Sequence, residues 1–169
     1  MITKKNTSII EDCITKALYK LIDKKPLDSI SITEIVEKAG VSRISFYRHY
    51  DSKLDVLNKQ LEKLSTEFIN NYYVDVTKDN IETNLLNFFQ IFYKYKELGE
   101  ALYKSNTQYL IQQQFHKVID KKLLNYNIYT RSFYTGGIYN CLLLWISTGF
   151  KETPKEIVNK ILIIIKTRI

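Results

Sequence analysis

The sequence predicts an all-α protein of about nine helices, and three observations support this. Apolar residues recur at three- and four-residue spacing almost throughout the 169 residues, which is the period of an amphipathic helix. Alternation of apolar and polar residues does not persist, so no strand is expected. Five glycines and two prolines leave little scope for long loops or many tight turns. The length suits one compact unit, or two small modules that share a core.

Two helices are predicted at the N-terminal end. An apolar face begins near Ile9, and its pattern ends before Pro26. Ser31 and Glu34 have the spacing of a capping box, which places the start of a second helix at Ser31. Gly40 stands where the C-terminus of that helix requires a left-handed residue.

The remaining helices follow the same periodicity. A short third helix has Ser42 as its cap, and a fourth begins at Ser52, with Asp55 three residues later. Apolar residues at heptad spacing predict that one stripe of the fourth helix is buried: Leu54, Leu57, Leu61, Leu64 and Phe68. After a polar break at 75–80, helices are predicted around 81–92, 97–104, 107–124 and 130–149. The last helix is predicted from Pro154, a favourable first-turn residue, to the end of the chain.

Composition narrows the class of protein. The formal net charge of +7 suits an anionic partner such as nucleic acid or a membrane surface, although many lysine-rich proteins bind neither. Cys13 and Cys141 match no metal spacing and no disulfide framework. The longest apolar run, residues 141–146, is too short to span a bilayer. We therefore expect a cytoplasmic protein with no membrane partner, no metal and no cofactor.

Residues 40–53, GVSRISFYRHYDSK, crowd aromatic rings and positive charge into a short segment. At 100° per residue, Ser42, Phe46 and Tyr50 fall on one side of a helix. The two rings are predicted to anchor this helix in the core. The opposite side and its flanks carry Ile44, Arg48, Ser45 and Tyr47, with Arg43 and His49 nearer the seam.

A helix, a tight turn and this second helix form the layout of a helix-turn-helix, whose second helix enters the major groove of DNA. Between residues 38 and 53, four lysines and arginines face one aspartate, Asp51, a net charge of +3. Arg43 and Arg48 have the reach for guanine edges or phosphates, and Ile44 for a thymine methyl. Tyr47 and His49 suit phosphates.

Lys53, at the start of the fourth helix, admits two interpretations. A helix N-terminus and a lysine together form a phosphate-binding site. Alternatively, Asp51 and Asp55 simply neutralise the lysine. A solvated basic face without DNA binding is the weaker alternative for the whole segment.

The stretch SITEIVEKAGVSRISFYRHYDSKLDVL resembles the DNA-binding domain of TetR/AcrR-type transcriptional regulators, over roughly residues 8–65. A looser resemblance, to the last two helices of a C-terminal domain found in part of that family, covers Gly136, Gly137, Trp145, Gly149 and residues 152–154. The first resemblance implies phosphate contacts from Thr33, Tyr47, His49 and Lys53, and base or groove contacts from Arg43, Ile44, Ser45 and Arg48. It also implies a helix-turn-helix domain over residues 1–51 and a helical regulatory and dimerisation domain over residues 52–169.

The family also implies a homodimer joined through its last two helices. Residues 138–146 are apolar nearly all round, and the last helix carries a wide apolar stripe, which favours a partner surface beside the core. Core packing alone is the alternative. The candidate dimerisation residues are Gly137, Leu144, Trp145, Ile157, Ile161, Leu162 and Ile165.

The resemblance to the family also implies a pocket for a small apolar or aromatic effector in the C-terminal part. Aromatic residues are plentiful in the second half of the chain, and apolar, aromatic walls are typical of such pockets. Plain core packing is the alternative. The candidate lining residues are Phe88, Phe92, Tyr103, Tyr109 and Tyr134.

These observations predict a sequence-specific, DNA-binding transcriptional regulator, a ligand-responsive repressor that acts as a homodimer on double-stranded DNA with a palindromic operator. The alternative is a dimeric α-helical protein-interaction module with no operator of its own. An enzyme is not expected, because the chain offers no carboxylate pair, phosphate loop or nucleophile elbow.

Overall fold

The computed structural model describes residues 4–73, 75, 77, 79–122 and 126–166. This part of the chain is all-α, as predicted, and contains nine α-helices and one short 3-10 helix, η1. Their bounds are α1 Lys4–Ile22, η1 Leu27–Ser29, α2 Ile32–Ala39, α3 Arg43–His49, α4 Lys53–Asn71, α5 Ile81–Lys94, α6 Lys96–Lys104, α7 Tyr109–Lys122, α8 Ile128–Ser147 and α9 Pro154–Lys166. Residues 123–124 of the predicted helix 107–124, and residues 167–169 of the predicted last helix, lie outside the described residues.

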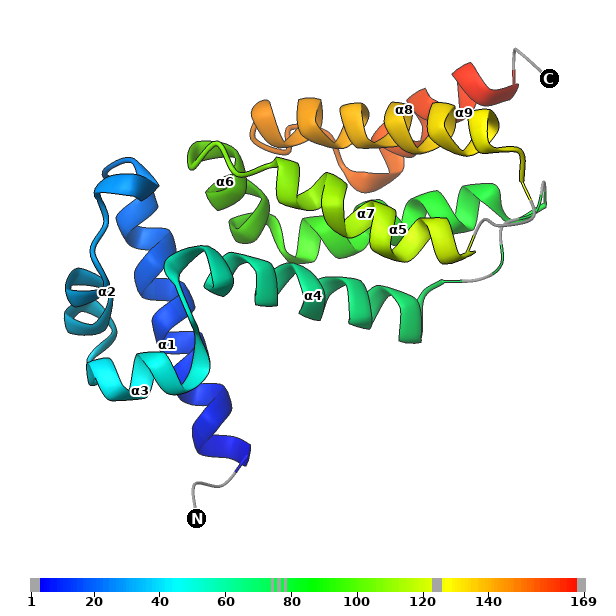
Figure 1. The fold of residues 1–169 in the computed structure, drawn as a ribbon. Helices are drawn as coiled ribbons and strands as arrows, with labels where there is room; N and C mark the ends of the chain where they lie inside the picture. Colours follow the sequence, from blue (N-terminus) through cyan, green and yellow to red (C-terminus); the bar gives the residue numbers. More distant parts are fainter. Residues whose placement is uncertain (1–3, 74, 76, 78, 123–125, 167–169) are drawn as a thin grey trace.

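Helices α1, α2 and α3 gather at one end of the molecule (Figure 1). α1 packs against both α2 and α3. Their shared core contains Ile14 and Leu18 from α1, Ile35 from α2, and the rings of Phe46 and Tyr50. Burial of these apolar side chains is the main free-energy gain that holds α2 and α3 on α1, since helices of seven or eight residues, such as α2 and α3, are marginal alone.

Helix α4 connects this end to the rest of the fold. Ser52 accepts a hydrogen bond from the backbone N–H of Asp55 at 3.1 Å, which confirms the predicted cap. Val56 and Leu57 are buried on the first half of the helix, and Leu61 and Leu64 on the second half. Figure 1 shows α4 running from the N-terminal helices along α5 and α7, and both helices contact it.

The C-terminal helices complete the same core. α5 packs against α9, α6 against α8 and α1, and α7 against α4 and α8. α8 and α9 lie on the side of the molecule away from α4 (Figure 1). Because buried residues form one continuous cluster from α1 to α9, the packing of the C-terminal part is linked to that of the N-terminal helices.

Candidate nucleic-acid interface

Helix α2 and the turn after it have the local structure that the sequence predicts. The Ser31 hydroxyl accepts from the N–H of Glu34 at 3.2 Å, and the Glu34 carboxylate accepts from the N–H of Ser31 at 2.9 Å. Hydrogen bonds from Lys25 and Ser31 lower the pKa of Glu34 to about 2. Gly40 is left-handed at φ 68°, and the N–H of Val41 then bonds back to the carbonyl of Val36 at 3.0 Å. This closure of α2 turns the chain sharply into α3.

Two aromatic rings attach helix α3 to the core. Phe46 is 0% exposed and Tyr50 is 2% exposed. The Ser42 hydroxyl caps the helix by accepting from the N–H of Ser45 at 3.0 Å. The rings of Phe46 and Tyr50 lie 5.8 Å apart between centroids, and Phe46 meets Tyr47 edge-to-face at 5.5 Å. The predicted anchoring side of α3 is therefore confirmed.

The opposite side of α3 faces solvent. Ile44 is 74% exposed and Tyr47 is 50% exposed, while Arg43 and Arg48 are also exposed and Ser45 is half-buried. The guanidinium carbon of Arg43 lies 5.9 Å from the centroid of the Tyr47 ring, within the range of a cation–π contact. The resulting surface combines two guanidinium groups, a phenol hydroxyl and a methyl-bearing side chain, which are the groups that read and hold duplex DNA.

His49 occupies the seam between α3 and α1. Its side chain is 8% exposed, and Nδ1 lies 3.3 Å from Oε1 of Glu11. Its backbone carbonyl accepts from Nζ of Lys59 at 2.6 Å. The predicted phosphate contact by His49 stays a prediction, and it would involve an imidazole that already faces a carboxylate of α1.

Lys53 has partners that neither sequence interpretation included. Its ammonium donates to the backbone carbonyls of Leu27, Asp28 and Ile30, at 2.6, 3.0 and 2.8 Å. Asp55 does not neutralise it: that carboxylate accepts from the N–H of Asp51 and pairs with Lys59.

Thr33, the remaining candidate DNA contact, is exposed at the second position of α2. The structure thus brings Arg43, Ile44, Tyr47 and Arg48 together on one outward face. It places His49 and Lys53 against the protein itself. The seam position of His49 could be read from helix geometry, whereas the carbonyl partners of Lys53 come from a segment about two dozen residues earlier in the chain.

The candidate dimerisation residues divide into exposed and buried groups. Leu144 is 66% exposed and Gly137 is exposed, while Ile165 is half-buried. Four candidates point into the core of the same chain instead: Trp145, Ile157, Ile161 and Leu162. Further exposed apolar side chains on α8 and α9, outside this candidate set, are Ile128, Tyr129, Phe133, Ile163 and Ile164.

Trp145 illustrates the reason for this division. Its indole is 1% exposed, donates to the carbonyl of Glu152 at 2.9 Å and stacks on Tyr93 at 5.9 Å. Because the apolar residues of α8 are spread around the helix rather than gathered in one stripe, periodicity alone could not distinguish its core side from its outer side.

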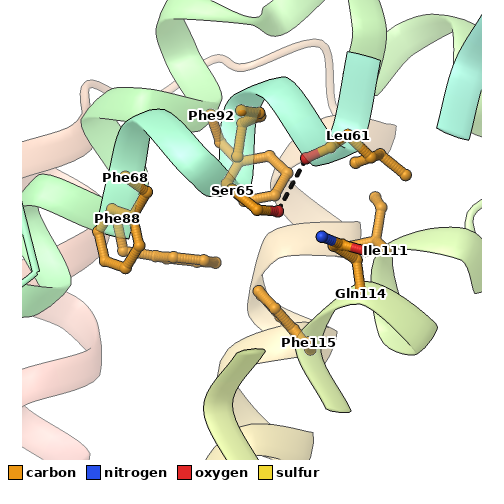
Figure 2. A pocket seen from close by; sticks show the side chains of 9 residues that line it. Leu61, Ser65, Phe68, Phe88, Phe92, Ile111, Gln114 and Phe115 are labelled. Carbon is orange, nitrogen blue, oxygen red and sulfur yellow. Dashed lines mark hydrogen bonds between the residues drawn. The ribbon is translucent and has the colours of Figure 1, made fainter. Parts of the chain in front are cut away.

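A small cavity of about 30 Å³ lies between α4, α5 and α7 (Figure 2). Phe88 and Phe92 line it, as predicted for a pocket, but Tyr103, Tyr109 and Tyr134 do not: the first two are exposed and the third is half-buried elsewhere. The other lining residues are Leu61, Leu64, Ser65, Phe68, Ile111, Gln114 and Phe115. All four aromatic rings of the lining are phenylalanines, which carry no hydroxyl that needs a hydrogen-bond partner.

Polar groups in the cavity are few. The Ser65 hydroxyl donates to the carbonyl of Leu61 at 2.8 Å (Figure 2), so its proton is already used within α4. Gln114 contributes an amide, which can both donate and accept. Among the described residues that line this cavity none is ionisable, so their chemistry is that of an uncharged, mainly aromatic space.

Two further properties of the described residues bear on function. No helix among them is both long and apolar enough to cross a membrane. Within the same residues, no three histidine, cysteine, aspartate or glutamate side chains gather as metal ligands would. Cys13 and Cys141 are free and half-buried, and burial raises the pKa of the Cys141 thiol.

Two family models match the chain. Residues 14–59, which include all of α2 and α3, match the model described as bacterial regulatory proteins, tetR family. Residues 79–167, more than half of the chain, match the model described as transcriptional regulator C-terminal region. A search of curated proteins found no match. The first match contains the outward face of α3, so similarity and geometry indicate the same segment.

Proposed function

The chain belongs to the tetR family of bacterial regulatory proteins, and from that premise we propose that it is a homodimeric, ligand-responsive repressor of a palindromic operator. DNA-binding transcriptional regulation is the activity of the family, whose members are regulators rather than enzymes. The proposal divides the chain into a DNA-binding part, residues 1–51, and a regulatory and dimerisation part, residues 52–169.

The observation that carries the proposal is the outward face of α3. Arg43 and Arg48 are exposed beside Ile44 and Tyr47, on a helix whose other side is held by two buried rings. A helix fixed in this way presents its side chains to a major groove at little further cost in conformational entropy. Arginine bidentate to guanine is the commonest specific contact in such grooves, while tyrosine hydroxyls bond phosphates.

Exposed apolar side chains on α8 and α9 support the homodimer. Phe133 and Leu144 on α8 are more than 60% exposed, as are Ile128 and Tyr129 in its first turn. α9 adds Ile163 and Ile164 to the apolar surface of these two helices. A second copy is the proposed partner, because a two-fold pair of α3 helices about 34 Å apart fits two successive major grooves.

Repression is the simplest output of such a dimer. A protein seated on a promoter blocks access to it without any further contact, whereas activation requires an additional surface that engages the transcription machinery. The position of the operator decides between the two.

The Phe-lined cavity supports an effector that is uncharged and aromatic. Its four rings, Phe68, Phe88, Phe92 and Phe115, suit a flat ligand, and Gln114 offers one hydrogen-bonding amide. At about 30 Å³ the cavity holds roughly two water molecules, so a larger ligand must displace side chains. A ligand that prefers the displaced arrangement would lower operator affinity by its differential affinity, typically about 1–3 kcal/mol.

A binding assay with two variants tests the DNA-binding roles. Fluorescence anisotropy with duplexes selected from a randomised library should show that Arg48→Ala loses about 1–3 kcal/mol on the preferred duplex and little on a scrambled one. Tyr47→Phe should weaken both duplexes alike, because a phosphate contact carries no sequence information. Unchanged binding by both variants would reject these roles, and a wild-type protein that retains no duplex at any salt concentration would favour the interaction-module alternative.

Sedimentation velocity tests the dimer. Leu144→Asp and Phe133→Asp each place a charge on the exposed apolar surface, and each should shift a dimer to monomer. Glu62→Gln, on the exposed side of α4, is the control and should remain dimeric. A wild-type protein that is monomeric at tens of micromolar contradicts the homodimer.

A further inference from the structure

Lys53 is the first residue of α4 and the point at which that helix meets the connection between α1 and α2. We propose that Lys53 is a positioning residue, which fastens α4 to this connection and so sets the orientation of α3 relative to the C-terminal helices, and that it is not a phosphate ligand. The proposal depends on the three hydrogen bonds from the ammonium group to backbone carbonyls. It also depends on how firmly the α1–α2 connection and α4, which these bonds join, are attached to the rest of the fold.

The ammonium group of Lys53 is fully used within the chain. It carries three N–H donors and no acceptor. Three carbonyl oxygens lie within 2.6–3.0 Å of Nζ, those of Leu27, Asp28 and Ile30. Contact with a phosphate would require the group to leave partners that already satisfy all of its donors. Hydrogen bonds to charged groups are the stronger class, so that exchange is unfavourable.

The connection that receives Lys53 is itself firmly attached. The side chains of Leu27 and Ile30 are buried in the core. On the outer side, Nζ of Lys25 lies 2.5 Å from the Glu34 carboxylate that caps α2. Lys53 therefore joins α4 to a segment anchored on α2 as well as in the core.

A second lysine joins α4 to the other end of the helix-turn-helix. Nζ of Lys59 donates to the carbonyl of His49, the last residue of α3, at 2.6 Å, and pairs with Asp55 at 3.2 Å. It also lies 5.2 Å from the centroid of the Tyr50 ring. The first two turns of α4 thus hold the segment before α2 through Lys53 and the end of α3 through Lys59.

The far half of α4 is attached to the C-terminal helices. Leu61, Leu64 and Phe68 line the cavity, and Glu67 accepts from Lys94 at 2.5 Å and from the hydroxyl of Tyr95 at 2.8 Å. A displacement of α4 at the cavity is therefore carried to the helix-turn-helix through Lys53 and Lys59. This inference rests on the proposed function for its DNA readouts but not for its exchange readout.

Amide hydrogen exchange tests the attachment without DNA. Lys53→Met keeps most of the side-chain length but removes the charge and all three donors. The amides of Ser29 and Ile30, which bond within the connection, should exchange at least about tenfold faster in this variant, while those of α9 stay unchanged. Lys38→Met, an exposed lysine on α2, is the matched control and should leave both regions unchanged. Equal protection of Ser29 and Ile30 in wild type and Lys53→Met overturns the proposal.

Salt dependence separates attachment from phosphate binding. Each phosphate neutralised by a lysine contributes about 0.9 to the slope of log Kobs against log salt. With a duplex selected by the wild-type protein, Lys53→Met should retain the wild-type slope, whereas removal of a lysine that neutralises a phosphate would reduce the slope by about 0.9 per protomer. A comparable reduction in Lys53→Met overturns the proposal. A wild-type protein without a salt slope contradicts the proposed function and leaves the exchange result to decide the role of Lys53.

Operator spacing provides a readout that a merely stabilising residue would not change. Inserting one base pair between half-sites should weaken wild-type binding by tenfold or more, while Lys53→Met, with a looser α3 orientation, should lose less than threefold. An unchanged spacing preference counts against the proposal. If Lys53→Met does not fold, Lys53→Arg replaces it: a planar guanidinium keeps the charge but not the three-way geometry. If Lys53→Arg shows the wild-type rates of amide exchange at Ser29 and Ile30 and the wild-type preference for half-site spacing, the proposal is overturned.

Discussion

Helices α3 and α8 both carry surfaces to which we assign a function, α3 for DNA and α8 for a second copy, but their sequences specify those surfaces very differently. α3 has seven residues, and its buried side, Phe46 and Tyr50, contrasts sharply with its cationic outer side. α8 has twenty residues, and its apolar residues are spread around the helix rather than gathered on one side. Within it, the neighbours Leu144 and Trp145 are 66% and 1% exposed, although both are large and apolar.

The difference shows which surfaces can be predicted from residue spacing and which depend on tertiary packing. A helix with opposed polar and apolar sides has one stable way to lie on a core, so its outer face can be read from spacing. A helix that is apolar all round can be rotated at little cost in burial, and its neighbours decide which side stays outside. Substitutions on α3 and in its flanking turn should therefore alter stability in ways that the sequence pattern predicts, whereas those on α8 depend on how that helix packs.

Removal of the α3 anchor should have the largest effect. Phe46→Ala deletes a fully buried ring and should lower the free energy of unfolding by about 3–5 kcal/mol, measured by urea unfolding. Tyr47→Ala, one residue further along and half exposed, should change it by less than about 1 kcal/mol. Similar losses for the two variants would mean that the division of α3 into two sides is incorrect.

A substitution in the turn between α2 and α3 should have a smaller effect on stability. Gly40→Ala should lower the free energy of unfolding by about 1–2 kcal/mol, because φ is 68° and an L-residue is strained there. An added Cβ at Gly40 meets no atom within 4 Å, so the loss is purely conformational. Thermal unfolding at neutral pH measures it, and a neutral result would imply that the turn readjusts freely.

A glycine-to-alanine substitution in α8 should instead raise the free energy of unfolding. Gly137→Ala places alanine inside a helix where an added Cβ meets nothing within 4 Å, and it should stabilise the fold by about 0.5–1 kcal/mol. Gly136→Ala is the matched control and should behave alike. A loss of stability confined to Gly137→Ala, and dependent on protein concentration, would instead place Gly137 directly in a contact between two copies.

The smallest expected change in stability is at the cap of α2, where acid should remove the contribution of the Glu34 carboxylate. The pKa of Glu34 is lowered from 4.5 to about 2 in the fold, so its contribution to stability is present above pH 4.5 and is lost as the pH falls towards 2. The urea midpoint of wild type should exceed that of Glu34→Gln at pH 6, and the gap should narrow by pH 2.5. Glu62→Gln, on α4, should show no such convergence. A gap that is independent of pH would show that the carboxylate charge does not stabilise the cap.

Much of the fold could be predicted because its determinants are local. Ser31, Gly40, Ser42 and Ser52 act on backbone groups within five residues of themselves, and each has the predicted role. The buried side of α3 follows from the separation of Phe46 and Tyr50 by one helical turn.

The candidate site could be predicted only in part. The outward position of Arg43, Ile44, Tyr47 and Arg48 follows from the helix that carries them. The environments of His49 and Lys53 do not, since they depend on Glu11 and on carbonyls of residues 27–30, which belong to other elements. The η1 turn, which supplies two of those carbonyls, those of Leu27 and Asp28, is likewise not predicted from the sequence.

The sequence alone specified the caps of α2, α3 and α4, the helix-turn-helix and the cationic side of α3, because each follows from interactions between residues a few positions apart. Packing between distant segments determines that Lys53 bonds the α1–α2 connection, that phenylalanines rather than tyrosines line the cavity, and that Leu144 faces outward while Trp145 faces inward. The physical reason is that burial and the choice of hydrogen-bond partner depend on which distant segments pack together, and one-dimensional periodicity contains no information about that choice.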